Sequence, residues 1–150
     1  MNQSFEARLS LSADRQAMMR LRGFVDAFAA ARGIGGEDVN RVLVAIEELV
    51  TNLVKYGYPG AAVPGSIVVT LRLDDDRLSV EIVDDGQEFD PFAQPPPDLD
   101  VPLEERSVGG LGLHLVRSLM EQTSHRRERG RNVTVIGRRV ALAEGVARKG

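Results

Sequence analysis

Two polar side chains that could do chemistry lie four residues apart in one stretch of the chain. Glu48 and Asn52 fall within residues 42–58, whose apolar positions repeat with the spacing of a helix: Val42, Ile46, Leu49 and Leu53. At ~100° per residue, the pair would share one helix face about 110° from the centre of that apolar stripe. A carboxylate can accept a proton, and an amide oxygen can bind Mg2+. The same pair would also suit the solvated face of any amphipathic helix.

A second candidate site is the Asp-Asp-Gly turn from Asp84 to Gly86, which directly follows the alternating strand pattern of residues 78–83. Glycine after a strand end lets the backbone turn sharply or approach a ligand closely. An aspartate held there could accept a hydrogen bond from an exocyclic amine such as that of adenine. The alternative is an ordinary Asp-Gly loop without a ligand.

A third candidate is the glycine cluster Gly109, Gly110 and Gly112, which opens an amphipathic helix over residues 113–122. Free N–H groups at a helix N-terminus, together with the helix dipole, favour a phosphate group. The cluster matches neither the dinucleotide-binding fingerprint, because no strand leads directly into it, nor the P-loop, because it lacks the lysine.

The elements that must position these residues follow from hydrophobic periodicity and turn residues. The chain is predicted to form, in order, a strand over residues 5–11, helices over 18–32 and 37–56, a hairpin of strands 66–73 and 78–83, the helix over 113–122, and a last hairpin that turns near Gly130 and ends in a strand over 132–140. Ser12 is expected to cap the first helix. The proline-rich residues 87–108 are predicted to be a functional loop or disordered, and residues 141–150 a frayed tail.

Composition excludes several functional classes. The chain has 150 residues, which suits one domain, and its net charge of −3 argues against a nucleic-acid partner. It has no cysteine, and its two histidines are too few for a metal cluster. The N-terminus lacks the pattern of a signal peptide, and no apolar run approaches the ~18 residues of a membrane span, so we expect a cytoplasmic protein without a membrane partner.

The three motifs stand in one order: E-x-x-x-N on a helix, D-x-G after a hairpin strand, and G-G-L-G-L opening a helix. The chain resembles the ATP-binding domain of the gyrase/histidine-kinase (GHKL) ATPase superfamily, in these motifs and in the segments IEELVTNLVKYGY, VDDGQEFDP and ERSVGGLGLHLV. It is most similar to the anti-sigma-factor serine kinases of bacterial partner-switching pathways. The resemblance spans about residues 5–140. It implies an α+β two-layer sandwich, whose mixed, largely antiparallel sheet is covered on one face by helices. It also implies a single ATP-binding domain over residues 1–140, with a lid loop at about 87–108.

The resemblance also implies roles for residues around the base and the metal. Asn52 corresponds to the asparagine that binds Mg2+, and Glu48 to the glutamate that acts as general base. Asp84 corresponds to the aspartate that reads the amino group of adenine, with Gly86 beside it. Thr134 corresponds to a polar residue of the last strand near adenine.

Near the phosphates, Gly110 and Gly112 correspond to the glycines whose backbone approaches ATP, and Gly109 is expected to assist them. Arg106 resembles a lid arginine near the γ-phosphate. One position departs from the family pattern, because Tyr56 stands where members often carry histidine. This difference bears on details near the phosphates.

The function that the resemblance implies is a serine/threonine protein kinase with ATP and Mg2+ as cofactors. The kinase would phosphorylate a serine of an anti-sigma-factor antagonist and, as a homodimer, sequester a sigma factor. One alternative is a partner-switch module that binds ATP without efficient phosphoryl transfer. Another is a stand-alone histidine-kinase-like ATPase domain, which is disfavoured because no helical hairpin with a phosphoacceptor histidine precedes the domain. His114 lies within the presumed phosphate-binding helix and is a poor phosphoacceptor candidate.

Overall fold

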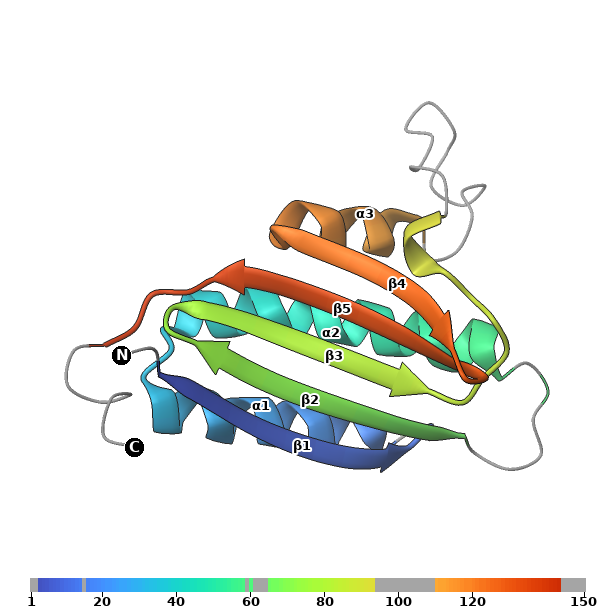
Figure 1. Cartoon of the computed structure of the whole chain (residues 1–150), viewed down its shortest axis with the longest axis horizontal. Helices are drawn as coiled ribbons and strands as arrows, with labels where there is room; N and C mark the ends of the chain where they lie inside the picture. Colours follow the sequence, from blue (N-terminus) through green and yellow to red (C-terminus); the bar gives the residue numbers. More distant parts are fainter. Residues whose placement is uncertain (1–2, 15, 59, 61–64, 94–109, 144–150) are drawn as a thin grey trace.

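A single antiparallel sheet of five strands forms one layer of the molecule (Figure 1). The computed structural model describes residues 3–14, 16–58, 60, 65–93 and 110–143, and the backbone alone for residues 110–112. The strands are β1 (Ser4–Ser12), β2 (Ser66–Asp74), β3 (Arg77–Asp84), β4 (Gln122–Glu128) and β5 (Arg131–Arg139). Their order is β1-β2-β3-β5-β4, and all four pairings between these described strands are antiparallel.

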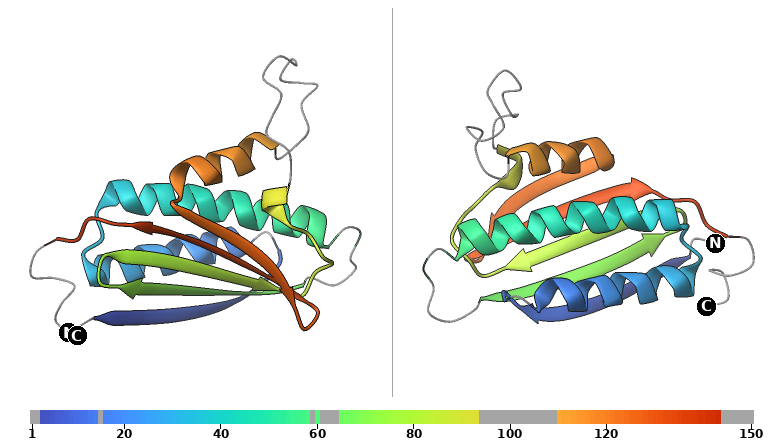
Figure 2. Two further views of the ribbon diagram at one scale, coloured as in Figure 1. Left: turned by 45° about the horizontal axis from the view of Figure 1, so that its top comes forward. Right: turned by 180° about the vertical axis from the view of Figure 1, so that it is seen from behind.

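Three helices cover one face of this sheet (Figure 2). They are α1 (Ala17–Arg32), α2 (Gly36–Gly57) and α3 (Gly110–Leu119). Helix α2 lies between α1 and α3 and packs against both. A short 3-10 helix, η1 (Pro91–Ala93), lies beside α2 and β4. The predicted α+β two-layer sandwich is therefore confirmed, with the described helices on one face of the sheet. The sheet was expected to be mixed and largely antiparallel, whereas the described strands pair only in antiparallel fashion.

The alternation of strand residues decides which side chains face the helices. On β3 the inward row is Leu78, Val80 and Ile82, all buried in the core between sheet and helices. Asp84 is the next member of that row, so the period of two places its carboxylate on the helix side. Thr134, on the inward row of β5, pairs with Ile82 in the register of the two strands. One end of the apolar core therefore carries polar groups.

The start of α1 differs from the prediction. Ser12 does not cap this helix, because it is the last residue of β1 and still pairs with Ser66. Asp14 instead stabilises the turn between β1 and α1, because its Oδ1 accepts a hydrogen bond from the Gln16 N–H at 2.9 Å. Gly33 ends the helix as predicted, in the left-handed conformation with φ 71°.

The described fold extends past residue 140, the predicted end of the domain. Leu142 forms an isolated antiparallel bridge with Ile34 in the connection between α1 and α2. Asp38, buried at the start of α2, accepts a hydrogen bond from the Ala141 N–H at 2.7 Å. Residues 144–150, the rest of the predicted tail, lie outside the described residues.

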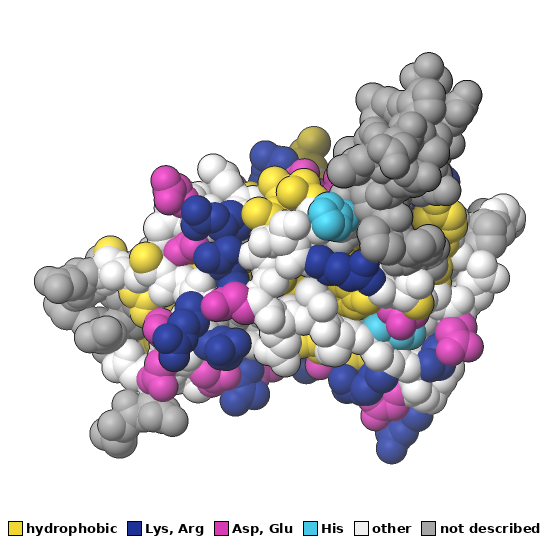
Figure 3. Space-filling view, turned by 90° about the horizontal axis from the view of Figure 1, so that it is seen from above, with side chains coloured by type: hydrophobic (Ala, Val, Ile, Leu, Met, Phe, Trp, Pro, Cys, Tyr) yellow, Lys and Arg dark blue, Asp and Glu magenta, His cyan; other side chains and the backbone are white. Residues whose placement is uncertain are grey.

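Basic and acidic side chains stand beside one another on the face seen in Figure 3, as expected for a chain of small net charge. Ion pairs between exposed side chains of the described residues include Arg126 with Glu128 at 2.9 Å and Arg72 with Asp74 at 2.9 Å. Within the described part of the chain, none of the helices has the length and apolar character needed to cross a membrane.

Candidate functional site

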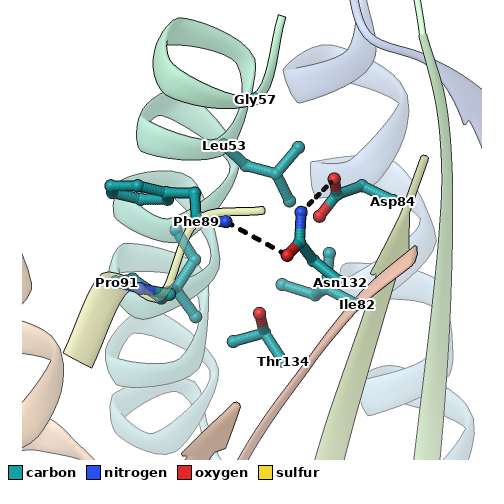
Figure 4. Close-up of a pocket in the computed structure, with 9 residues that line it drawn as sticks. Leu53, Gly57, Ile82, Asp84, Phe89, Pro91, Asn132 and Thr134 are labelled. Carbon is teal, nitrogen blue, oxygen red and sulfur yellow. Dashed lines mark hydrogen bonds between the residues drawn. The ribbon is translucent and has the colours of Figure 1, made fainter. Parts of the chain in front are cut away.

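A cavity lies between α2 and the sheet, where β3 ends and β5 begins (Figure 4). Its walls come from three parts of the chain: Leu49, Leu53 and Gly57 of α2; Ile82, Asp84, Asn132 and Thr134 of the sheet; and Phe89 and Pro91 of the segment after β3. The free space inside is about 10 Å³, the room of roughly one water molecule. In this structure the cavity is therefore nearly closed.

Asp84 is the charged group of the cavity, and it is only 1% exposed. Its Oδ1 accepts hydrogen bonds from the Gly86 N–H at 2.9 Å and from the Asn132 amide at 3.0 Å. Burial raises the pKa of this carboxyl, and the two hydrogen bonds and nearby Arg127 oppose the rise. Both of these bonds end on Oδ1, so Oδ2 is the oxygen left to accept a hydrogen bond from a ligand.

Gly86 permits a close approach between the turn after β3 and the end of α2. A Cβ atom built on Gly86 would lie 2.7 Å from the carbonyl oxygen of Gly57, which is closer than real Cβ atoms come to an oxygen. The same carbonyl accepts a hydrogen bond from the Gln87 N–H at 2.9 Å. Arg127 donates to the Gly86 carbonyl at 2.7 Å. The turn that carries Asp84 is therefore fixed against both α2 and β4.

The neighbouring carboxylate, Asp85, lies in a different environment. It is exposed and accepts hydrogen bonds from the Tyr58 hydroxyl and from the Ser66 N–H, the latter at 2.9 Å. The Tyr58 hydrogen bond is the main reason that the pKa of Asp85 is lowered, whereas burial raises the pKa of Tyr58. Asp85 therefore holds the chain after α2 in place and does not face the cavity.

Helix α2 also carries the predicted catalytic pair. Asn52 is buried and Glu48 is half-buried. The Asn52 amide nitrogen donates to the backbone carbonyl of Glu48 at 2.7 Å, which uses the donor side of the amide and leaves the oxygen as a ligand atom. Mg2+ commonly takes only one or two protein oxygens when phosphates and waters supply the others. The Asn52 oxygen could therefore serve as one protein ligand of Mg2+.

Tyr56, the departure from the family pattern, packs on the wall of the cavity. Its ring stacks on the Phe89 ring with centroids 4.9 Å apart and an interplanar angle of 26°. The Gln87 side chain donates to the Tyr56 carbonyl at 2.7 Å. An aromatic residue at this position therefore supports the segment that closes the cavity.

The structure brings some of the predicted site residues together. Asp84 and Thr134 line one cavity, and Gly86 forms the turn beside it. Gly110 and Gly112 lie in the first turn of α3, where the backbone alone is described. Other predicted residues lie outside the described residues: Arg106, Gly109 and the part of the predicted lid loop (about 87–108) from residue 94 onward.

Asn132 and Phe89 are among the cavity residues that sequence reasoning did not assign to the site. Asn132 could have been found, because it precedes Thr134 by two positions and so shares its inward row on β5. Phe89 carried no such signal, because it lies in an irregular segment without periodicity.

Comparisons with known proteins find relatives of this domain. A family model described as "Histidine kinase-like ATPase domain" matches residues 11–137. The serine-protein kinase RsbW of Staphylococcus epidermidis is 30% identical over 135 residues, which cover 87% of this chain and 84% of that protein. RsbW of Bacillus cereus is 28% identical over 135 residues, which cover 87% of this chain and 82% of that protein.

A solved structure shows the same fold. The crystal structure of the RsbU and RsbW domains of Rv1364c from Mycobacterium tuberculosis matches with a TM-score of 0.67 and 21% sequence identity, covering 93% of this chain and 33% of that longer chain. The chain belongs to the histidine kinase-like ATPase domain family. Within this family, the RsbW relatives confirm the predicted likeness to the anti-sigma-factor serine kinases.

Proposed function

We propose that the protein binds ATP with Mg2+ and transfers the γ-phosphoryl group to a serine of a partner protein. The observation that carries this proposal is a buried carboxylate, Asp84, in a cavity whose other wall is the helix that bears Glu48 and Asn52. The family match and the relatives named serine-protein kinase RsbW support the same function.

At the base end, the cavity has the chemistry that adenine requires. Asp84 can accept a hydrogen bond from the exocyclic amine, and the Thr134 hydroxyl, which lines the same cavity (Figure 4), can bond a ring nitrogen. Leu49, Leu53 and Ile82 supply apolar walls for the flat ring. The base therefore has both an orienting carboxylate and an apolar slot.

At the phosphate end, the residues would position groups and stabilise charge, which is most of what phosphoryl transfer asks of a protein. Asn52 would hold Mg2+, which neutralises phosphate charge when bound. Amides at the start of α3, at Gly110 and Gly112, would bind phosphate oxygens, assisted by Gly109 and Arg106. Glu48 would take the proton from the serine hydroxyl of the partner.

The proposed partners are an anti-sigma-factor antagonist, which supplies the serine, and a sigma factor, which the protein sequesters. The support is the likeness to RsbW over 87% of the chain. We further propose that the working form is a cytoplasmic homodimer and that residues 1–140 form the ATP-binding domain, to which residues 141 and 142 add the contacts with Asp38 and Ile34.

A second candidate is a switch that binds ATP but transfers its phosphoryl group poorly. Tyr56 favours this candidate, because it replaces the histidine common in the family and packs on Phe89 at the cavity wall. Retention of Glu48 favours the kinase.

Substitution of Glu48 separates the two candidates. The test mixes the protein with Mg-ATP and antagonist-type proteins from the same genome, and detects phosphoserine by mass spectrometry. Glu48→Gln is expected to bind ATP as the unsubstituted protein does, but to transfer phosphoryl groups about 10²- to 10⁴-fold more slowly, because the general base is lost. Glu47→Gln is the matched control, since Glu47 accepts a hydrogen bond from Arg22 of α1.

Equal transfer by the Glu48→Gln and Glu47→Gln proteins would remove Glu48 from the mechanism. ATP binding by the unsubstituted protein without phosphoserine on any antagonist-type protein would favour the switch over the kinase.

A further inference from the structure

The Asn132 side chain lies in the cavity wall, and all of its hydrogen-bond donors and acceptors have partners. It belongs to a residue that is 2% exposed. Its amide nitrogen donates to Asp84 Oδ1 at 3.0 Å and to the Gln87 carbonyl at 2.8 Å. Its oxygen accepts from the Phe89 N–H at 3.2 Å and lies 3.1 Å from Nε2 of His125. The two donors and two acceptor positions of the carboxamide are all used.

Two of these four bonds join β5 to the backbone of the segment that closes the cavity. Figure 4 shows the Asn132 amide between Asp84 on one side and the Phe89 nitrogen on the other. The same segment carries the Phe89 and Pro91 side chains, which form one wall. The side chain of Asn132 therefore holds that wall against the sheet.

The closed wall leaves too little room for a nucleobase. The free space is about 10 Å³, whereas ligand pockets commonly hold about 300 Å³ or more. The walls from α2 and β3 belong to the main hydrophobic core through Leu49 and Ile82. The start of the segment that closes the cavity has little core packing, since Gln87 and Glu88 are exposed and Phe89 is only half-buried, whereas Pro91 farther along is buried. A base can enter when this segment moves outward.

We propose that Asn132 is a latch that keeps the base cavity closed in the empty protein. This inference rests on the proposed nucleotide-binding function. Base entry breaks the hydrogen bonds from Asn132 to the backbone of Gln87 and Phe89. While the cavity is closed, the Asn132 amide N–H donates a hydrogen bond to the buried Asp84 carboxylate. Adenine would offer the same carboxylate an N–H donor of the same kind.

His125 holds the latch from the other side. Its side chain is 6% exposed, with Nδ1 3.7 Å from a carboxylate oxygen of Asp90 and Nε2 beside the Asn132 oxygen. Asp90 is next to Pro91 in the chain, so this contact links β4 to the closing segment, in addition to the bonds that Asn132 makes from β5. This arrangement orients the carboxamide so that its nitrogen faces Asp84 and Gln87.

The population of the open form then limits nucleotide binding. If only a small fraction of the protein is open, the apparent association rate is reduced by that fraction. Loss of two hydrogen bonds that exist only in the closed form is expected to raise the open fraction by about tenfold. A residue that merely lined the site would slow or weaken binding when removed.

The test compares Asn132→Ala with Ser124→Ala, an exposed position on β4 of the same sheet. Stopped-flow mixing with a fluorescent ribose-labelled ADP measures the association rate constant. Hydrogen exchange of the empty protein measures opening at the Gln87 amide, whose acceptor, the Gly57 carbonyl, is unchanged by the substitution. Asn132→Ala is expected to associate about fivefold or more faster and to exchange faster at Gln87, whereas Ser124→Ala changes neither.

A second variant covers the case in which Asn132→Ala does not fold. Asn132→Asp keeps the shape and the acceptor for the Phe89 N–H, but it loses the donor to Gln87 and places a carboxylate against Asp84. It is expected to open the cavity as well, with the same two readouts.

The outcomes are distinct. An unchanged or slower association rate with unchanged exchange at the Gln87 amide would overturn the latch. Failure of the unsubstituted protein to bind any adenine nucleotide would overturn the proposed function instead. In that case exchange in the empty protein still decides the latch, since faster exchange in Asn132→Ala supports it and unchanged exchange refutes it.

Discussion

Asp84 and Asp85 are adjacent in the chain, yet their carboxylates differ in chemistry because they lie in different surroundings. Asp84 ends the inward row of β3, and burial raises its pKa. Asp85 lies just after the strand, where hydrogen bonds from Tyr58 and Ser66 lower its pKa. Only Asp84 has the buried position that makes one hydrogen bond to a ligand decisive for affinity.

The raised pKa of Asp84 predicts a pH dependence of nucleotide affinity. An ionised carboxylate is the stronger acceptor for the adenine amine, so affinity is full above the raised pKa and falls as the pH falls through it. Acidification does not unfold the protein through this group, because a raised pKa means that the folded state takes up the proton more readily than the unfolded state. Binding of labelled ADP measured from neutral to mildly acidic pH tests this.

Two variants show whether Asp84 is the group that titrates in that measurement. Asp84→Asn cannot titrate, so its affinity is expected to be low and flat over the same pH range. Glu88→Gln removes an exposed carboxylate of the same loop and should keep the full pH dependence. A pH profile of Asp84→Asn identical to that of the unsubstituted protein would assign the titration to another group.

Asn52 predicts a metal dependence. Asn52→Ala removes the oxygen proposed for Mg2+, so the gain in ATP affinity that Mg2+ gives to the unsubstituted protein should disappear, while weak metal-free binding stays. Calorimetric titration with Mg2+ and with excess EDTA measures this difference. Thr51→Ala, at the exposed neighbouring position, is the control. A persistent Mg2+ effect in Asn52→Ala would place the ion elsewhere.

At the scale of elements, the contact between the end of α2 and the turn after β3 sets the shape of the cavity. Gly86→Ala would place a Cβ 2.7 Å from the Gly57 carbonyl oxygen, so the two backbones must separate. We expect a loss of about 1–3 kcal/mol in the free energy of unfolding, measured by urea denaturation, together with weaker nucleotide binding.

Gly23→Ala is the matched control for that substitution. Gly23 lies within α1, and a Cβ atom there would meet no atom within 4 Å. The substitution should therefore stabilise the protein by about 0.5–1 kcal/mol through helix propensity. A Gly86→Ala protein as stable as the unsubstituted one would show that this approach is not tight in solution.

Element positions were largely predictable from sequence, because the strands alternate cleanly and the helices carry periodic apolar stripes. The Val42, Ile46, Leu49 and Leu53 stripe is buried as expected, and the inward placement of Asp84 follows from the same periodicity. Ser12 was assigned wrongly as a cap, because a strand continued through a residue type that also favours helix starts. The local preferences of serine do not decide between the last residue of a strand and a helix cap.

At the scale of the whole molecule, residues from α2, β3 and β5 meet at one cavity, and the resemblance in sequence was sufficient to predict that Asp84 and Thr134 would share it. The closed state of the cavity was not predictable. It depends on the Asn132 bonds to the backbone of residues 87 and 89, and these join a strand to an irregular segment without periodicity. Such contacts depend on three-dimensional packing and leave no pattern in sequence.

A calorimetric comparison of Mg-ATP with Mg-GTP tests most directly whether this cavity binds the adenine base. Adenine presents an amine donor where guanine presents an oxygen acceptor, and a buried carboxylate accepts the first and repels the second. The unsubstituted protein should bind Mg-ATP at one site and bind Mg-GTP at least about tenfold more weakly. Asp84→Asn should lose most of this discrimination. Equal binding of the two nucleotides, or of neither, would contradict the assignment of this cavity to the adenine base.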